Sequence, residues 1–302
     1  MFRVFRVCSL IFILLLLAFP SLAFKGASYG LTLWFSTMLP TLLPFMIASS
    51  LLVGLKVPLL FERLVRLLPA RLRFNGAYLT AIGVGFFCGY PVGAKMSRDL
   101  YQEGLIDDRE CCFLAAFCNL PSPMFLVGYI AVPHILPSVY LSAALVAVCA
   151  RFVYLPSQKR LAAAEYRQTK RKAVPPSPSL METMENSITQ SLILIAKIGG
   201  YMILFSIFAV WILVLTERQP LIQAVCSAIL EMTTGISYIK RLSLPGSLGS
   251  VLCAQAAAFG GLCSMAQTKS VIADSPVSIA HYGLWKLLHM TLCGLLMYLF
   301  SL

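Results

Sequence analysis

Residues 85–104 read GFFCGYPVGAKMSRDLYQEG, an apolar, glycine-rich run that leads into a proline and then into four charged residues. Pro91 removes a backbone donor and clashes with the preceding turn, so a helix entering from Ala77 is expected to stop or kink near Tyr90. Non-helical backbone at membrane depth survives only where it is buried in protein or lines a cavity. This stretch therefore predicts a broken helix inside a membrane protein.

The composition places the chain among membrane proteins. It has 302 residues, of which 59% are hydrophobic and 12% charged, and its mean hydropathy is +0.84. Soluble domains of ordinary composition are far less apolar. About 20 apolar residues in a helix cross the ~30 Å hydrocarbon core. The clear apolar runs are Val7–Phe24, Gly30–Leu55, Met124–Val153, Ser191–Leu215 and His281–Leu302. Three more are interrupted: Ala77–Leu105, Leu221–Ile239 and Leu248–Ala273.

The expected fold is an all-α polytopic membrane protein with roughly eight membrane segments, arranged as two related halves with broken or re-entrant helices. Each half contains an interrupted apolar segment followed by a lysine, at Gly83–Lys95 and at Ala258–Lys269. Such paired interruptions are the best sequence pointer to a transporter's binding site. The predicted organisation is a first span or signal anchor (1–25), a first membrane half (26–155), a basic, proline-rich linker (156–185) and a second half (186–302).

The distribution of charge indicates a lipid bilayer as the partner and argues against nucleic acid. The formal net charge is +12, but the basic residues cluster before the first apolar run, at 56–73 and at 151–172. Such clusters are the positive-inside signal, so the N-terminus and the linker are predicted to be cytoplasmic. Arg3 and Arg6, the apolar run and Ser21-Leu22-Ala23 also fit a cleaved secretory signal. An uncleaved first span is the favoured interpretation.

Nothing in the sequence predicts a catalytic residue, a metal or a cofactor. The ten cysteines include no C-x-x-C pair, and the three histidines have no zinc-type spacing. Gly26-Ala27-Ser28-Tyr29-Gly30 matches G-x-S-x-G, but a nucleophile elbow needs a strand-turn-helix context. We expect this match to lie by chance in a loop between two membrane segments. The protein is therefore not expected to be an enzyme.

The first candidate binding region is the Gly-Tyr-Pro break. Gly83, Gly85, Gly89 and Gly93 have no side chains, so a ligand or a helix could approach the backbone closely there. Tyr90 and Pro91 lie at the break itself and belong to the same candidate binding region. A new helix starting near Val92 would point its positive end into the cavity, where an anionic or polar solute could dock. Lys95 could neutralise a carboxylate there; its alternative role is to pair with Asp99 at i, i+4.

Three further polar positions complete the candidate set. Asn119 lies in an apolar segment just before Pro121 and Pro123. It is expected to be paired with another polar group or to bind a ligand, and the alternative is an interfacial loop between two helices. Glu231 is an intramembrane carboxylate, which is by default a functional hypothesis. It could hold an ion or a proton, lock the halves as a structural ion pair, or be the partner of a lysine: Lys95, Lys197 or Lys269. Gln267, with Gln255, provides hydrogen-bonding groups around Phe259, Gly260 and Gly261.

Several motifs together resemble the YlbJ-type sporulation integral membrane proteins, a family with the nucleoside-recognition or Gate domain. They are PTLLPFMI (40–47), GYPVGAKMSRDLYQEG (89–104), FCNLPSPMF (117–125), IGGYMILFSI (198–207), LEMTTGI (230–236) and AFGGLCSMAQ (258–267). The resemblance implies a permease of endospore-forming bacteria, with dipicolinate as the first solute to test. The chain departs from the family in Asn119-Leu120-Pro121-Ser122-Pro123 and in FGGLCSMAQ. The Gate name does not itself establish nucleoside binding.

The predicted function is thus an integral membrane permease of a small anionic or planar solute, in a bacterial cell or forespore membrane. Tyr90 and Phe259 are candidates to stack on a planar ring. A coupling ion or a proton is a candidate second ligand. The alternatives are a nucleoside-type transporter and a non-transporting membrane scaffold that gathers partners through its basic linker.

Overall fold

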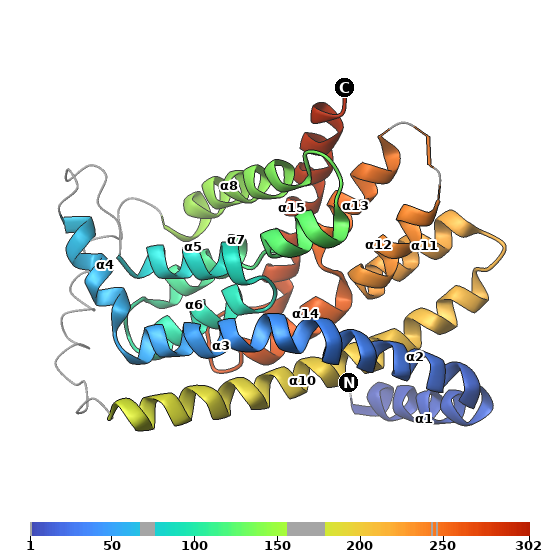
Figure 1. Ribbon diagram of the computed structural model, residues 1–302, viewed down its shortest axis with the longest axis horizontal. Coiled ribbons are helices and arrows are strands. Elements are labelled where there is room, and N and C mark those ends of the chain that lie inside the picture. The colour runs from blue at the N-terminus through green and yellow to red at the C-terminus, as the bar shows by residue number, and fades with distance from the viewer. Residues whose placement is uncertain (1, 67–75, 156–178, 243, 246) are drawn as a thin grey trace.

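The structure is a computed structural model that describes residues 2–66, 76–155, 179–242, 244–245 and 247–302. Over these ranges every regular element is a helix, as Figure 1 shows. Residues 156–178 of the predicted linker (156–185) lie outside the described residues. A helix begins at Leu180, within the predicted linker, and the linker's boundaries stay a prediction. The basic cluster at 56–73 is likewise described only as far as Arg66.

The part of the chain before the linker begins with helix α1 (Phe2–Ala18). One continuous helix then runs from Pro20 to Gly54 and comprises α2 (Pro20–Leu33), a π-helical turn η1 (Trp34–Met38) and α3 (Leu39–Gly54). Helix α4 (Val57–Arg66) follows. Two interrupted pairs come next, α5 (Gly76–Cys88) with α6 (Val92–Gln102), and α7 (Asp108–Phe117) with the π-helical η3 (Phe125–Ile130). Helix α8 (Ile135–Tyr154) is uninterrupted.

The described residues after the linker have a similar order of elements but no counterparts of α1 and α4. Helix α10 (Leu180–Leu215) is 36 residues long. Two interrupted pairs follow, α11 (Pro220–Leu230) with α12 (Met232–Arg241), and α13 (Leu248–Phe259) with α14 (Gly261–Val271). Helix α15 (Ile279–Phe300) is again uninterrupted. The same sequence of a long helix, two broken pairs and a continuous helix supports two related halves, and their division into domains stays a prediction.

The start of the chain differs from the sequence expectation. Val7–Phe24 is not one span, because the helix is interrupted at Phe19 and a new helix begins at Pro20. Proline is favoured in the first turn of a helix, where its missing N–H has no partner to lose. The G-x-S-x-G match is not in a loop either: Gly26 and Gly30 lie within α2. They face α10, where a Cβ on Gly26 would come within 2.7 Å of the Cα of Ile207.

The long helices α2-η1-α3 and α10 lie side by side along one edge of the molecule (Figure 1). Trp34 anchors the pair, because its indole N–H donates a hydrogen bond of 2.9 Å to the carbonyl of Ile195. At 1.5 Å per residue each of these helices is about 50 Å long. That length exceeds the ~30 Å hydrocarbon core, so both helices tilt in the bilayer or extend beyond it.

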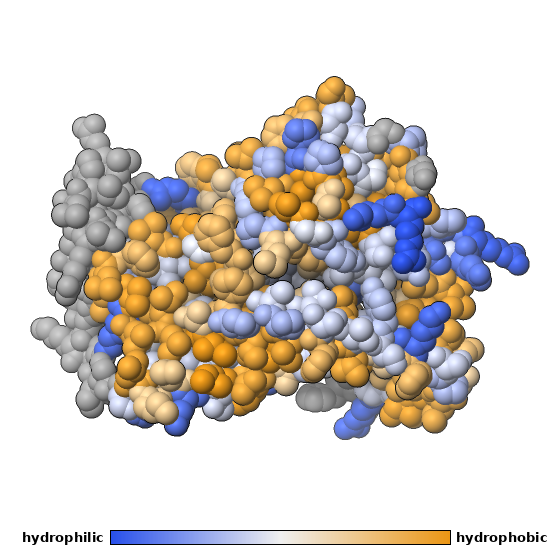
Figure 2. All heavy atoms as spheres, in the orientation of Figure 1, coloured by the Kyte–Doolittle hydropathy of each residue, from blue (hydrophilic) through white to orange (hydrophobic). Residues whose placement is uncertain are grey.

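The side chains are distributed as in a protein that faces lipid. Large apolar side chains point outward, including Phe24 at 75% exposure and Phe152 at 77%. Figure 2 shows apolar residues over most of one face, with the most hydrophilic side chains toward its margins. Polar side chains, including Lys95, Asn119 and Lys286, are buried instead. Five helical stretches among the described residues are long and apolar enough to cross a membrane, one of which, Leu248–Val271, joins α13 and α14. The expected all-helical, polytopic membrane fold is confirmed.

Helices α11 and α12 fold back on each other at very close range. A Cβ added to Gly235 on α12 would lie 2.1 Å from the Cα of Ala228 on α11, closer than any real contact. The added Cβ and the Cα of Ala228 are both fixed to the backbone, so neither can move without shifting a helix. The absence of a side chain at Gly235 therefore sets the angle of this broken pair.

We expect Gly235→Ala to destabilise the protein by roughly 1–3 kcal/mol, the usual cost of overpacking a tight interface. The matched control is Gly200→Ala on α10, where an added Cβ meets nothing within 4 Å. That control is expected to be neutral or stabilising by about 0.5–1 kcal/mol, because alanine restricts the unfolded chain. Thermal unfolding in detergent measures both, and equal melting temperatures for the two variants would contradict the packing account.

Candidate functional site

The breaks within the four interrupted pairs, α5/α6, α7/η3, α11/α12 and α13/α14, meet in the interior of the molecule. The carbonyl of Cys118, at the α7 break, lies where Cβ atoms on Gly85 and Gly93 would be, 2.1 Å from each. Gly260, between α13 and α14, has φ +83° and approaches the ring of Tyr90. A Cβ on Gly261 would lie 3.1 Å from the carbonyl of Ala228, at the α11 break. Each break therefore packs against another break, which satisfies the requirement that irregular backbone be enclosed in protein.

A cavity of about 530 Å³ opens where three of these breaks face the continuous helix α2-η1-α3. Its walls come from η1 and α3, from the Gly-Tyr-Pro break, from the segment between α7 and η3, and from the start of α12. The lining includes five aromatic rings, those of Phe45, Phe87, Tyr90, Phe125 and Tyr129. Around them lie the hydroxyls of Thr37, Thr41, Ser122 and Thr233. No charged side chain is among the described residues that line it.

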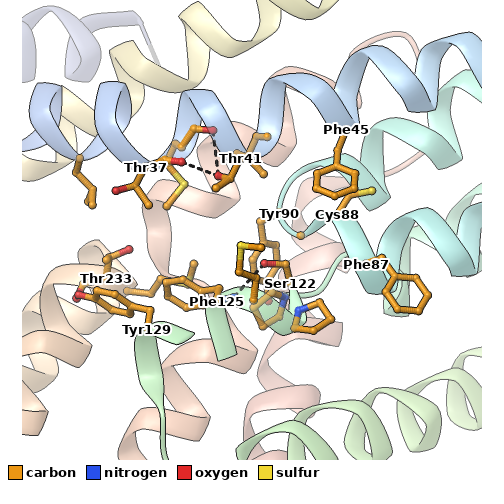
Figure 3. A pocket seen from close by; sticks show the side chains of 18 residues that line it. Thr37, Thr41, Phe45, Phe87, Cys88, Tyr90, Ser122, Phe125, Tyr129 and Thr233 are labelled. Atoms are coloured by element: carbon orange, nitrogen blue, oxygen red, sulfur yellow. Dashed lines mark hydrogen bonds between the residues drawn. The ribbon is translucent and has the colours of Figure 1, made fainter. Parts of the chain in front are cut away.

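Both π-helical turns of the described chain contribute to this cavity. Thr37 and Met38 come from η1, and Phe125 and Tyr129 come from η3. Single π-turns within membrane and soluble helices often mark functional sites. Figure 3 shows the threonines of the long helix on one side and the rings of Phe125 and Tyr129 on the other. The irregular turns thus present side chains to the cavity from opposite walls.

One buried hydroxyl among the residues that line the cavity lacks a partner within the described protein. Thr233 is 2% exposed, and its side-chain oxygen makes no hydrogen bond there. Three other lining hydroxyls have partners: Tyr129 donates to the carbonyl of Thr233 at 2.8 Å, Thr41 donates to the carbonyl of Thr37 at 2.6 Å, and Ser122 accepts from the backbone N–H of Phe125 at 3.2 Å. A buried polar atom without a partner is costly. The hydrogen-bonding capacity of Thr233 is therefore unused at a position beside the cavity wall.

Asn119 joins the breaks beneath the cavity wall. Its side-chain oxygen accepts the backbone N–H of Ala94 at 3.3 Å, which caps the start of α6. Its amide nitrogen donates to the hydroxyls of Thr268 at 3.0 Å and Tyr282 at 2.7 Å. Asn119 is 1% exposed and does not line the cavity. Its hydrogen bonds are internal, as expected of a paired polar residue in an apolar segment, and its binding of a ligand stays a prediction.

Lys286 on α15 lies at the centre of this network. Its amine donates to the hydroxyl of Tyr90 at 2.6 Å and to the carbonyl of Asn119 at 3.2 Å, and lies 3.4 Å from Nδ1 of His289. It also lies 4.7 Å from the centre of the Tyr90 ring. Tyr90 in turn donates to the carbonyls of Ala257 and Ala258 at the end of α13. Tyr90 therefore connects the cavity lining to a buried lysine amine.

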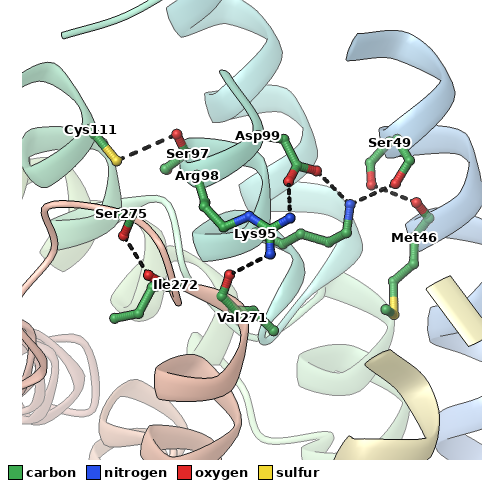
Figure 4. A network of polar contacts seen from close by, with 11 residues as sticks. Met46, Ser49, Lys95, Ser97, Arg98, Asp99, Cys111, Val271, Ile272 and Ser275 are labelled. Carbon is green, nitrogen blue, oxygen red and sulfur yellow. Dashed lines mark hydrogen bonds and ion pairs between the residues drawn. The ribbon is translucent and has the colours of Figure 1, made fainter. Parts of the chain in front are cut away.

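Lys95 takes the alternative role stated above. Its amine pairs with Asp99 one turn later and donates to Ser50 on α3 at 2.6 Å. Figure 4 shows the amine of Lys95 between Asp99 and α3. Arg98 also contacts Asp99, at 3.2 Å, and donates to the carbonyl of Val271. This group borders a separate polar pocket of about 220 Å³ between α3, α6 and the start of α10. Lys95 does not line the aromatic cavity.

Glu231 acts as a helix cap. One carboxylate oxygen accepts the backbone N–H of Thr233 at 3.0 Å, and the other accepts the N–H and the hydroxyl of Thr234, both at 2.7 Å. These bonds satisfy donors at the N-terminus of α12, where a negative charge is also favoured by the helix dipole. No lysine of the described chain forms an ion pair with it. The expected pairing with Lys95, Lys197 or Lys269 is therefore wrong, because the cap uses the carboxylate locally.

The structure brings two predicted site residues, Gly89 and Tyr90, to the cavity itself. The others surround the breaks: Pro91, Gly93, Asn119, Glu231, Gly260, Gly261 and Gln267. Gln267 donates to the sulfur of Cys263, and Phe259 is half-buried outside the cavity lining. None of these positions has been tested for binding, so each role in solute recognition stays a prediction.

Sequence reasoning missed the polar face of α15. Tyr282, Lys286 and His289 are each at most 2% exposed and share one helix face. The signal was present, because Lys286 is a lone lysine in an apolar run of spanning length, and intramembrane ionisable residues are functional hypotheses by default. The π-turns left no comparable signal.

One curated relative is similar to this chain. It is the sporulation integral membrane protein YlbJ of Bacillus subtilis (strain 168), which is 29% identical over 217 residues. The match covers 63% of this chain and 51% of the relative, so the chain spans about half the length of that protein. No family model matches the chain, and no solved structure matches it. The similarity confirms the resemblance to YlbJ found in the motifs, and the Gate-domain assignment stays a prediction.

The Lys95–Asp99 pair predicts a measurable coupling. Asp99→Asn leaves the ammonium of Lys95, which is 2% exposed, without its counter-charge, and we expect it to cost about 3 kcal/mol. The double variant Lys95→Met/Asp99→Asn removes both charges and is expected to recover much of that loss. Thermal unfolding of the single and double variants checks this. Strictly additive losses would show that the two charges do not interact.

Proposed function

We propose that this protein is a membrane permease for a small planar solute and acts in endospore formation. The observation that carries the proposal is the cavity of about 530 Å³ at the meeting point of the broken helices. Cavities of about 300–1,000 Å³ suit small-molecule ligands. Broken helices at membrane depth are the usual frame of a transporter's binding site. The role in sporulation rests on the similarity to the YlbJ protein.

The lining favours a flat ring as the solute. Phe87, Phe125, Tyr129 and Tyr90 offer ring faces and edges around the cavity. Aromatic pairs stack with an offset or meet edge to face, and gain about 0.5–1.5 kcal/mol beyond the area they bury. The unpartnered hydroxyl of Thr233 offers one hydrogen bond to a polar substituent. The predicted stacking on Tyr90 is part of this proposal, whereas Phe259 lies outside the cavity lining.

Dipicolinate is the first solute to test, because it is planar and because the resemblance to sporulation proteins implies it. Nucleosides are the second class, since their bases are planar and their riboses carry hydroxyl groups. The third alternative is a membrane scaffold that moves no solute. It accounts for the basic linker, which lies outside the described residues, but gives no reason for an aromatic cavity. Coupling to an ion or proton and the cytoplasmic placement of the N-terminus stay predictions.

Filling the cavity tests the proposal. Thr41→Trp adds a large side chain to the α3 wall and is expected to lower solute uptake into proteoliposomes roughly tenfold or more, since the ring takes the solute's place. The control is Phe35→Trp on η1, where the side chain is 67% exposed and outside the cavity lining. Radiolabelled dipicolinate and a nucleoside are assayed in parallel.

Uptake of one solute by the wild-type protein and the control, but not by Thr41→Trp, identifies the solute class and places its path through the cavity. Unchanged uptake in folded Thr41→Trp would overturn the assignment of the cavity. The absence of uptake of either solute by folded wild-type protein would favour the scaffold.

A further inference from the structure

We propose that Lys286 is the residue that selects an anionic solute. In this proposal the side chain of Tyr90 is a latch: it covers the amine of Lys286 and must rotate away before the solute's carboxylate can bind there. This inference rests on the proposed permease function and names the group that would recognise the charge. It replaces Lys95, whose amine pairs with Asp99 and Ser50 away from the aromatic cavity.

The contacts of Lys286 fit a charged amine. An ammonium group has three donors and no acceptor. Three acceptors surround it: the oxygen of Tyr90, the carbonyl of Asn119 and Nδ1 of His289. His289 is oriented for this, because its Nε2 lies 3.0 Å from the carbonyl of Val139, which can only accept. The proton of the neutral ring therefore sits on Nε2 and leaves Nδ1 as an acceptor.

This cation has no counter-charge in the described part of the chain. Lys286 is 1% exposed, and the carboxylates of the described residues form no ion pair with it. A buried charge that is held only by neutral groups is costly and is rarely kept without a function. Lys95 shows the contrast within the same molecule, because it is equally buried but has Asp99. The missing negative charge at Lys286 is what an anionic solute would supply.

The cavity ends next to this amine. Tyr90 lines the cavity with its ring and holds Lys286 with its hydroxyl, at 2.6 Å. Pro121 lines the cavity two residues after Asn119, whose carbonyl is the second acceptor of the amine. Lys286 itself is not part of the lining. One side chain, that of Tyr90, therefore stands between the solute and the cation.

The hydroxyl of Tyr90 keeps the latch closed. It donates to the carbonyls of Ala258 at 3.0 Å and Ala257 at 3.2 Å, and it accepts from Lys286. The bond from an ammonium to this neutral hydroxyl has one charged partner, whereas a carboxylate that replaces the hydroxyl as the acceptor pairs two opposite charges in one hydrogen bond. Rotation of the ring out of this position, with the carboxylate taking its place, exchanges a neutral partner of Lys286 for a charged one.

The test uses the purified full-length protein in detergent and two probes of the same shape. Dipicolinate carries two carboxylates, and dipicolinamide, its diamide, is neutral. Binding of each is measured by calorimetry to the wild-type protein and to Lys286→Met, Lys286→Arg and Tyr90→Phe. Lys286→Met is expected to weaken dipicolinate binding roughly 10- to 100-fold and to leave dipicolinamide within about threefold, from the usual strength of a hydrogen bond to a charged group.

Two further variants keep the test decisive if Lys286→Met does not fold. Lys286→Arg retains the charge and is expected to keep the preference for the dianion. Tyr90→Phe frees the latch and is expected to strengthen dipicolinate binding relative to dipicolinamide. A purely structural Lys286 predicts the opposite pattern, in which each variant changes the binding of both probes by the same factor. That equal change, or unaltered dianion preference in folded Lys286→Met, overturns the proposal.

The outcomes separate this inference from the proposed function. If neither probe binds the folded wild-type protein, the planar-solute proposal fails, and the assignment of Lys286 falls with it. If both probes bind the wild-type protein with equal affinity, a planar-solute site stands and the selecting role of Lys286 is wrong.

Discussion

The structure depends on one constraint: backbone groups freed by a helix break inside a membrane must find partners within the protein. The breaks meet this constraint largely by bonding to one another. Asn119, at one break, caps the helix that starts at another, and Tyr90 donates to the last carbonyls of α13. Glu231 caps the helix that follows its own break. Helix ends leave such groups unsatisfied by geometry alone, so these side chains are what hold the breaks together in the interior.

The same arrangement places the groups that fit a solute's shape apart from the group that could recognise its charge. The cavity presents rings and hydroxyls, while the nearby cation, Lys286, lies behind the Tyr90 wall. The other strongly polar region, near Asp99 and Arg98, opens into a different pocket. An aromatic chamber selects by flatness and size, and a charge held behind its wall can add selection by sign once a solute is inside. In this respect the site differs from an open, charged funnel, which would attract every anion.

The sequence predicted the kind of fold well, because hydropathy and proline act locally. The break at Tyr90-Pro91 was readable from proline alone, and the glycines around it are where helices touch. The roles of side chains were predicted less well, since they depend on which distant segments meet. Lys95 proved to pair with Asp99, and Glu231 proved to be a cap. Lys286 gained its importance from Tyr90 and Asn119, which are far from it in the chain and could not be paired with it from one sequence.

The central claim is that a solute occupies the aromatic cavity, and protection of an introduced cysteine tests it most directly. Thr37→Cys, in a background with the native cysteines replaced, places a thiol on the η1 wall. The account predicts that dipicolinate slows maleimide labelling of this thiol in a saturable way and leaves a thiol at Phe35→Cys, outside the lining, unaffected. If the Thr37→Cys protein transports a planar solute but that solute does not slow its labelling, the account is contradicted.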